Sequence, residues 1–312
     1  MKFYKPKFWD KRDHISLFSI LLIPFSLIAI IKNYFENNKN KKNFYDLKTI
    51  CVGNIYIGGT GKTPLVNNLA SHFKKRFKTY IVKKNYTSHL DEKNLLESKH
   101  KVIFEKTREL SILKAENKKA EMLIFDDGLQ EKRINYDLKI VCFNSLKLDG
   151  NGRIIPAGPL RERLISIKNY DIVLINGNPS KESKNFINKI KKINPNIKIF
   201  TGRYVPKNYS KLKKKKFVIF SGIGNPHTFS DTLKSLKIKF NNYVKFPDHY
   251  DYKESDLQKL RNLAKIKNCE LLTTEKDYFR IKKSLQKNIN FLKVELSVDK
   301  EKKFYKYLNE RL

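Results

Sequence analysis

The chain has 312 residues, and its 66 Lys and Arg against 31 Asp and Glu give a formal net charge of +35. This length supplies a sizeable core and suggests one large domain or two medium ones. The cysteines, Cys51, Cys142 and Cys269, are isolated in the sequence, which excludes a disulfide framework or a zinc knuckle and fits a reducing compartment.

The positive charge has two explanations. A charge of this size is typical of proteins that bind nucleic acid or an anionic membrane. However, Lys greatly outnumbers Arg, and Asn, Ile, Phe and Tyr are abundant, which is the composition that an AT-rich coding sequence favours. We therefore expect coding composition to cause most of the charge, with a smaller contribution from an acidic surface. We expect no nucleic-acid partner.

The N-terminal segment has the composition of a membrane anchor. Basic and aromatic residues alternate over residues 1–12, a combination suited to a lipid headgroup layer. An apolar run follows over residues 15–31, with Pro24 inside it. A helix needs about 20 residues to cross a bilayer, so we expect residues 1–43 to form an embedded or interfacial anchor with a linker rather than a span. A signal peptide and a buried core helix remain alternatives.

The next segment, residues 50–64, reads ICVGNIYIGGTGKTP and has the order of a phosphate-binding loop: apolar strand, glycines, then helix. Glycines permit positive φ and bring backbone N–H groups close to an anion. Lys62 is predicted to reach the β- and γ-phosphates of ATP, and Thr63 to offer its hydroxyl to Mg²⁺. The strict pattern has Gly at the position of Tyr56, so the loop is P-loop-like. The predicted nucleotide-binding residues are Tyr56, Ile57, Gly58, Gly59, Thr60, Gly61, Lys62 and Thr63.

Strand and helix patterns alternate along the rest of the chain. Apolar runs indicate strands at residues 50–52, 80–82, 122–125, 138–143 and 172–175, with helices near 63–75 and 108–118. The alternation predicts an α/β core with a mostly parallel sheet flanked by helices, over residues 44–210. A second βα series runs from 217–220 past 271–273 to 291–294, which predicts a second, smaller α/β domain over residues 211–312.

Two carboxylates end the predicted strand in MLIFDD, residues 122–127. P-loop proteins hold Mg²⁺ at such a strand end, opposite the Ser or Thr of the loop. Adjacent carboxylates repel one another unless a cation compensates them, so Asp126 and Asp127 are predicted metal ligands. A plain Asp-Asp-Gly turn is the alternative.

Two irregular segments carry further candidates. Residues 151–163, NGRIIPAGPLRER, form a predicted loop in which arginines could clamp phosphate and Glu162 could complete a metal shell. Residues 246–252, FPDHYDY, put His249 beside Asp248 and Asp251, which could orient the imidazole or raise its basicity. The alternatives are a solvated charge cluster and a solvated loop histidine.

Six segments together resemble the tetraacyldisaccharide 4′-kinase (lipid A 4′-kinase) family over most of the chain: VGNIYIGGTGKTP, FDDGLQ, PAGPLRER, FSGIGNP, FPDHYDY and TTEKD, in that order. The resemblance implies transfer of the ATP γ-phosphoryl group to the 4′-hydroxyl of a tetraacylated glucosamine disaccharide 1-phosphate, at the cytoplasmic face of the inner membrane. It therefore implies ATP and Mg²⁺ as cofactors, and a glycolipid and a membrane surface as partners.

The resemblance also implies roles for individual residues. Lys62 would bind the transferred phosphate, and Asp91, in Leu90-Asp91-Glu92-Lys93, would be the base that accepts the hydroxyl proton, assisted by His249. Thr63, Asp127 and Glu162 would be the Mg²⁺ neighbours. The family's Ser-Arg-Gly-Tyr appears here as Lys83-Lys84-Asn85-Tyr86, and Glu131 replaces a family histidine.

Two other classes of protein remain open. A P-loop ATPase or GTPase of the membrane-associated partitioning type would share the loop, the acidic strand end and the anchor, but it would need neither PAGPLRER nor FPDHYDY. A basic nucleic-acid-binding protein would explain the charge of +35 but would leave the glycine loop unused.

Overall fold

The computed structural model describes residues 6–11, 16–37, 46–84, 90–223, 226–248 and 250–312. The chain forms two units, the first made of residues 1–85, 100–204 and 296–312, and the second of residues 86–99 and 205–295. These units differ from the predicted domains, because residues 1–43 are part of the first unit, the boundary predicted after residue 210 lies after residue 204, and two further segments change unit. Residues 296–312 belong to the first unit because Phe304 packs edge to face against Phe200, with ring centroids 5.0 Å apart. Residues 86–99 belong to the second unit.

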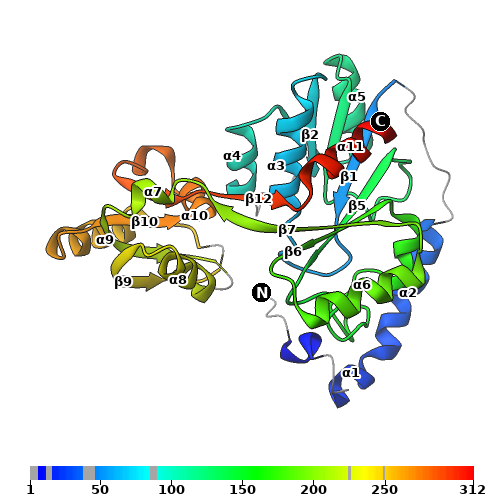
Figure 1. The fold of residues 1–312 in the computed structure, drawn as a ribbon, viewed down its shortest axis with the longest axis horizontal. Coiled ribbons are helices and arrows are strands. Elements are labelled where there is room, and N and C mark those ends of the chain that lie inside the picture. The colour runs from blue at the N-terminus through cyan, green and yellow to red at the C-terminus, as the bar shows by residue number, and fades with distance from the viewer. Residues whose placement is uncertain (1–5, 12–15, 38–45, 85–89, 224–225, 249) are drawn as a thin grey trace. The chain divides into compact units, whose positions relative to one another are not determined.

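The first unit is built on an eight-stranded sheet with the order β12-β7-β6-β5-β1-β4-β2-β3 (Figure 1). Adjacent strands from β7 to β3 pair in parallel, which confirms the predicted mostly parallel α/β sheet. The strands are β1 (Lys48–Gly53), β2 (Thr79–Lys84), β3 (Val102–Glu105), β4 (Met122–Asp126), β5 (Leu138–Asn144), β6 (Ile172–Asn176), β7 (Lys198–Pro206) and β12 (Val294–Val298).

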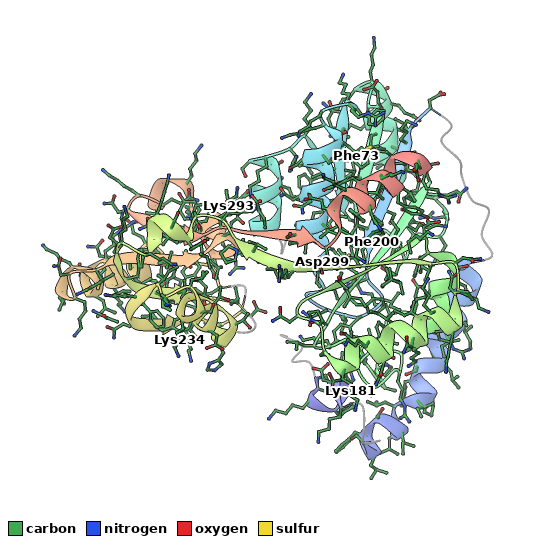
Figure 2. All side chains as sticks on the ribbon, in the orientation of Figure 1. Phe73, Lys181, Phe200, Lys234, Lys293 and Asp299 are labelled. Carbon is green, nitrogen blue, oxygen red and sulfur yellow. The ribbon has the colours of Figure 1, made fainter. Side chains whose placement is uncertain are left out.

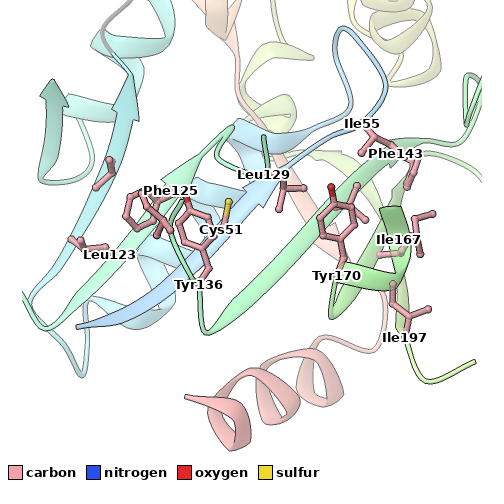
Figure 3. Close-up of a cluster of buried hydrophobic side chains, with 14 of the residues drawn as sticks. Cys51, Ile55, Leu123, Phe125, Leu129, Tyr136, Phe143, Ile167, Tyr170 and Ile197 are labelled. Carbon is pink, nitrogen blue, oxygen red and sulfur yellow. The ribbon is translucent and has the colours of Figure 1, made fainter. Parts of the chain in front are cut away.

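The sheet of the first unit is apolar on both faces because helices and loops cover both of them. On one face Phe125 meets Tyr136 with ring centroids 4.9 Å apart, beside Cys51 (Figure 3). The residues of β4 are buried along the whole strand, which explains its continuous apolar sequence. The flanking helices are α3 (Lys62–Phe73), α5 (Arg108–Asn117), α6 (Lys181–Ile193) and α11 (Glu301–Arg311), with the 3₁₀ turn η2 (Leu164–Asn169).

The second unit has a parallel four-stranded sheet with the order β11-β10-β8-β9. The strand expected at 291–294 is two strands, because β11 ends at Leu292 and β12 begins at Val294. Lysine side chains such as Lys234 extend away from the ribbon (Figure 2). The elements are β8 (Lys216–Ser221), β9 (Lys239–Lys245), β10 (Glu270–Thr274), β11 (Ile289–Leu292), α4 (Leu90–Glu97), α7 (Tyr209–Leu212), α8 (Pro226–Ser235), α9 (Glu254–Ile266), α10 (Glu275–Arg280) and η3 (Lys283–Leu285).

The N-terminal segment forms the 3₁₀ turn η1 (Lys7–Asp10) and two helices, α1 (Leu17–Leu21) and α2 (Ile23–Asn37). Pro24 lies in the first turn of α2, where a missing N–H costs little. Within the described ranges, no helix has the length and apolar character needed to cross a membrane.

On the helices α1 and α2 the serines face the protein and the large apolar side chains face solvent, which is the reverse of an ordinary surface helix. Ser19 and Ser26 are buried and donate hydrogen bonds to Ala157 O at 2.6 Å and to Ile154 O at 2.9 Å. The large apolar side chains are exposed instead; Phe18, for example, is 70% exposed. The exposed apolar residues of the pair are Leu17, Phe18, Ile20, Leu21, Ile23, Phe25, Leu27, Ile28 and Ile31.

Candidate active site

The glycine loop connects β1 to α3, which begins at Lys62. Gly61 has a φ of 90°, and a Cβ on it would lie 1.9 Å from Asn176 Nδ2, so only glycine fits this position. A Cβ on Gly58 or Gly59 would meet nothing within 4 Å. The space beside the Gly58–Gly59 backbone is therefore open, as an approaching phosphate requires.

Side chains from neighbouring segments hold the loop in shape. Asn54 Nδ2 donates to Gly58 O at 3.1 Å, and Asn176 Nδ2 donates to Thr60 O at 2.7 Å. Tyr56, which stands where the strict motif has glycine, is fully buried and its hydroxyl donates to Asp10 of η1. Its side chain thus fixes the base of the loop and links it to the N-terminal segment.

Lys62 points across the loop toward the end of β4. Its Nζ donates to Asn54 Oδ1 at 2.9 Å and lies 3.6 Å from Asp127 Oδ1. The side chain is 15% exposed, so it is mostly but not completely shielded from water. The ammonium group thus lies beside the glycine loop, as the predicted contact between Lys62 and phosphate requires.

Asp126 ends β4 and is buried, with its side chain fully shielded from solvent. Its Oδ2 accepts from Lys83 Nζ at 2.6 Å and from Thr63 Oγ1 at 3.4 Å. Its Oδ1 has no hydrogen-bond partner among the residues that the structure describes. A buried carboxylate oxygen without a donor indicates a missing ligand, such as a water molecule or a cation.

Asp127 follows with a φ of 62°, in the left-handed region that few residues other than Gly adopt. Arg161 Nη1 donates to both carboxylate oxygens, at 2.9 and 3.0 Å, and Arg108 donates to the backbone oxygen of Asp127. Burial by itself would raise the pKa of Asp127, but the charges of Lys62 and Arg161 outweigh burial and hold the pKa below its ordinary value. The carboxylate is therefore ionised and surrounded by cations.

Glu162, the remaining predicted metal ligand, is buried and already engaged. Its Oε1 accepts from Gln130 Nε2 at 3.2 Å, and its Oε2 accepts from Lys132 Nζ and from Tyr170 Oη, each at 3.1 Å. Gln130 Oε1 also accepts from Arg161 Nη1 at 3.2 Å, which links Glu162 to Asp127. The hydrogen bonds thus connect the predicted metal ligands in two groups, Thr63 with Asp126 and Asp127 with Glu162, and Asp126 and Asp127 are neighbours in the chain.

The two predicted proton-transfer residues are Asp91 and His249. Asp91 lies in α4 of the second unit, and its side chain is outside the described part of the chain. His249 lies outside the described residues. Their roles remain predictions.

Six residues around these groups were missed as site residues by sequence reasoning: Asn54, Lys83, Arg108, Gln130, Lys132 and Tyr170. Arg108 had a usable signal, since Thr107 caps the helix that Arg108 starts, and a helix start after a parallel strand lies at the carboxyl edge of the sheet. Lys83 was marked only as a departure from the family's Ser-Arg-Gly-Tyr, and its contact with Asp126 could not be predicted because it depends on β2 pairing with β4.

The donors present fit a hydrated Mg²⁺ ion bound together with a triphosphate. Mg²⁺ uses oxygen ligands and is usually held by one or two carboxylates plus substrate phosphates. The Thr63 hydroxyl and the Asp126 carboxylate, whose Oδ1 has no partner in the described ranges, supply such oxygens. Throughout the described residues, no group of three or more His, Cys, Asp and Glu side chains is placed to hold a metal without a ligand's help.

These features define a P-loop-type nucleotide-binding protein with an α/β fold. A sequence profile of the Tetraacyldisaccharide-1-P 4′-kinase family matches residues 17–312, and the chain belongs to this family. It is 44% identical to the tetraacyldisaccharide 4′-kinase of Pelagibacter ubique, over 97% of this chain and 96% of that protein. It is 34% identical to the enzyme of that name from Rickettsia akari, over 100% and 97%.

A solved structure supports the fold. LpxK from Aquifex aeolicus, crystallised in complex with ATP, matches with a TM-score of 0.73 and 24% identity, over 95% of this chain and 99% of that one.

Proposed function

We propose that this protein transfers the γ-phosphoryl group of ATP to the 4′-hydroxyl of a tetraacyldisaccharide 1-phosphate, a step of lipid A biosynthesis. The family and the names of its relatives give the reaction. The observation that carries the proposal is the meeting of Lys62, Thr63 and Asp126 at one end of the sheet, beside the open Gly58–Gly59 backbone.

The loop residues would bind and orient the nucleotide. Backbone N–H groups of residues 58–63 would hold the phosphate oxygens, and Lys62 would neutralise the charge that develops on the transferred group. Mg²⁺, held near Thr63, Asp126, Asp127 and Glu162, would supply further neutralisation of the phosphates when bound. Arg161 fixes the Asp127 carboxylate by a two-oxygen contact, which keeps it oriented toward Lys62.

Asp91 would accept the proton of the attacking hydroxyl, with His249 assisting. The support is the family resemblance of the residues around Asp91 and in FPDHYDY. A base acts in the chemical step, so Asp91→Asn should lower kcat far more than it weakens ATP binding. Equal effects on both would assign Asp91 another role.

The helices α1 and α2 would lie on the membrane surface, at the cytoplasmic face of the inner membrane. The serines of these helices hydrogen-bond to the rest of the protein, whereas Phe18, Phe25 and Ile28 are exposed. The exposed side chains form an apolar surface whose contact with water is unfavourable. Burying apolar side chains in the interfacial region would remove this cost, as in interfacial amphipathic helices.

The same loop supports both the helices and the nucleotide site. Residues 154–157 accept the hydrogen bonds of Ser19 and Ser26, and the Pro156 oxygen accepts a hydrogen bond from Trp9 Nε1 at 3.0 Å. A few residues further on, Pro159 O accepts from the N–H of Ile57 in the glycine loop, at 2.9 Å. A membrane-bound α1–α2 pair would therefore hold the glycine loop close to a glycolipid headgroup.

Phosphorylation of the lipid tests the reaction. Purified protein is incubated with radiolabelled ATP and tetraacyldisaccharide 1-phosphate in mixed micelles, and the labelled lipid is quantified. Lys62→Ala should abolish transfer without unfolding the protein, whereas Lys75→Ala, an exposed lysine beyond the end of α3, should leave it unchanged. ATP hydrolysis with no labelled lipid would favour the partitioning-type ATPase instead.

Flotation with anionic phospholipid vesicles tests the anchor. Phe18→Asp and Phe25→Asp should each weaken vesicle binding by at least about tenfold, since burying one such side chain contributes roughly 1.5–3 kcal/mol. Ile266→Asp is the matched control, because Ile266 is an apolar residue of α9 that is 78% exposed. Equal binding of all three variants and the wild type would refute the anchor.

A further inference from the structure

A second lysine, Lys83, enters the nucleotide site from a neighbouring strand. Lys83 lies near the end of β2, and the parallel register puts it beside Asp126 of β4. Its Nζ is 2.6 Å from Asp126 Oδ2, and its side chain is only 10% exposed. The two groups therefore form a buried ion pair at the edge of the sheet where the glycine loop ends.

Stability alone explains this ion pair poorly. Removing two charges from water costs about as much as their attraction returns, so a buried pair is often no more stabilising than two apolar side chains. The pair also leaves Asp126 incompletely satisfied, because Oδ1 has no hydrogen-bond partner in the described part of the chain. A cation that is buried at this cost, beside an unsatisfied carboxylate, suggests a further ligand.

The charges around the pair indicate an anionic ligand. Four cationic side chains meet at Asp126 and Asp127: Lys83 pairs with Asp126, Lys62 and Arg161 contact the Asp127 carboxylate, and Arg108 donates to the Asp127 backbone oxygen. Thr63, in the first turn of α3, shares Asp126 Oδ2 with Lys83, so the ammonium group is one carboxylate away from the N-terminal end of this helix. Helix N-termini preceded by a glycine loop bind phosphate.

We propose that Lys83 is a second phosphate-binding lysine, which contacts the bound triphosphate and sets how strongly nucleotide binding depends on Mg²⁺. The proposal rests on the nucleotide site of the proposed function. Lys83 and a divalent cation are both attracted to Asp126 and to the phosphates. With Lys83 present, part of the phosphate charge is neutralised without metal, and Mg²⁺ competes with an ammonium group for Asp126.

Isothermal titration with a non-hydrolysable ATP analogue tests this, once with excess EDTA and once with Mg²⁺. Lys83→Met keeps most of the apolar stem but removes the charge. We expect it to weaken binding in EDTA by about tenfold to a hundredfold, the usual effect of losing one charged hydrogen bond. In Mg²⁺ we expect less than about a threefold loss, because the variant frees Asp126 for the metal.

Two control variants separate the charge from the fold. Lys83→Arg keeps the charge and should retain most of the metal-free affinity, and Lys84→Met changes the exposed neighbouring lysine and should behave as the wild type. If Lys83→Met does not fold, because Asp126 is left buried without its partner, the comparison is made between Asp126→Asn and the double variant Lys83→Met with Asp126→Asn. The double variant should then show the same selective loss in EDTA.

The outcomes separate this proposal from the proposed function. Equal losses in EDTA and in Mg²⁺, or no loss in either, overturn the role of Lys83 while the kinase reaction still stands. Selective loss in EDTA without transfer of phosphate to the lipid supports Lys83 and overturns the kinase. No nucleotide binding by the wild-type protein overturns both.

Discussion

Each of the two units has a buried aspartate at the carboxyl end of its sheet. The two aspartates differ in how many hydrogen bonds their carboxylate oxygens accept. Asp277, in α10 of the second unit, is fully buried and accepts from Gly222 N, Tyr252 Oη, Arg280 Nη1 and Thr274 Oγ1 at distances between 2.7 and 3.1 Å. Asp126, in the first unit, accepts two hydrogen bonds on one oxygen and has no described partner on the other.

The comparison separates a structural carboxylate from one that is ready to bind a ligand. Asp277 ties together three of the motifs that the sequence singled out, namely FSGIGNP through Gly222, FPDHYDY through Tyr252 and TTEKD through Thr274. All of its bonding capacity is used within the fold. Asp126 keeps capacity for a ligand, because its Oδ1 has no partner among the described residues. Motif residues can therefore have either function, and only the bonding pattern separates the two.

The largest effect is expected from Asp277→Ala. Removing one partner of a buried, hydrogen-bonded ion pair costs about 3–5 kcal/mol, because Arg280 would remain buried with its charge unpaired. Calorimetry should show this loss, and hydrogen exchange should place it in β8 and β10. Affinity for the ATP analogue should stay within about twofold of the wild type, since the nucleotide loop belongs to the other unit. A large loss of affinity would mean that Asp277 also acts on the site.

Asp126→Asn should have the opposite effects, a large loss of activity and a small loss of stability. We expect kcat to fall by about 10²–10³-fold, the usual effect of removing one group that stabilises charge in the transition state. The unfolding free energy should fall by no more than about 1–2 kcal/mol, because the amide oxygen still accepts from Lys83. Steady-state kinetics and urea unfolding on the same preparation measure both. If stability falls as far as in Asp277→Ala, the difference between the two aspartates disappears.

The regular part of this architecture could be predicted from the sequence. The apolar runs that became β1, β4, β5 and β6 are long and buried on both faces, so the sequence indicates them without any tertiary information. The return of residues 296–312 to the first sheet could not be foreseen, because an edge strand joins whichever sheet its neighbours allow. Its position depends on contacts such as that between Phe304 and Phe200.

The candidate site likewise contains residues that could be predicted from the sequence and contacts that could not. Gly58–Thr63 and the two aspartates are local motifs, and the sequence was sufficient to single them out. The contacts of Lys83 and Gln130 depend on which strands and loops become neighbours, and no spacing in the sequence encodes that. The serines of α1 and α2 are an intermediate case. Ser19 and Ser26 are seven residues apart and so share one helix face, but the sequence does not say whether this face meets protein or solvent.

The smallest expected effect concerns how the stability of the protein depends on pH. The surrounding cations hold the pKa of Asp127 below its ordinary value of 3.8, whereas burial raises the pKa of Asp277 above 3.8 although hydrogen bonds oppose the rise. The stability that Asp127 contributes is thus present above pH 3.8 and is lost as the pH falls through its lower folded pKa. For Asp277 the native state holds the proton more tightly than the unfolded chain, so stability is lost as the pH rises through its higher folded pKa.

The two aspartates should therefore respond oppositely to the same substitution. Asp127→Asn should make the loss of stability below pH 3.8 shallower, because one ionised group no longer has to be protonated on acidification. Asp277→Asn should make the free energy of unfolding rise more steeply with pH above 3.8. The variant lacks the carboxylate whose ionisation is unfavourable in the native state, so this contribution no longer lowers stability as the pH rises. Urea unfolding at pH values on both sides of 3.8 measures the slopes. If both variants change the slope of the unfolding free energy against pH in the same pH range and with the same sign, the two carboxylates have equivalent surroundings. That result would contradict the bonding patterns of Asp127 and Asp277.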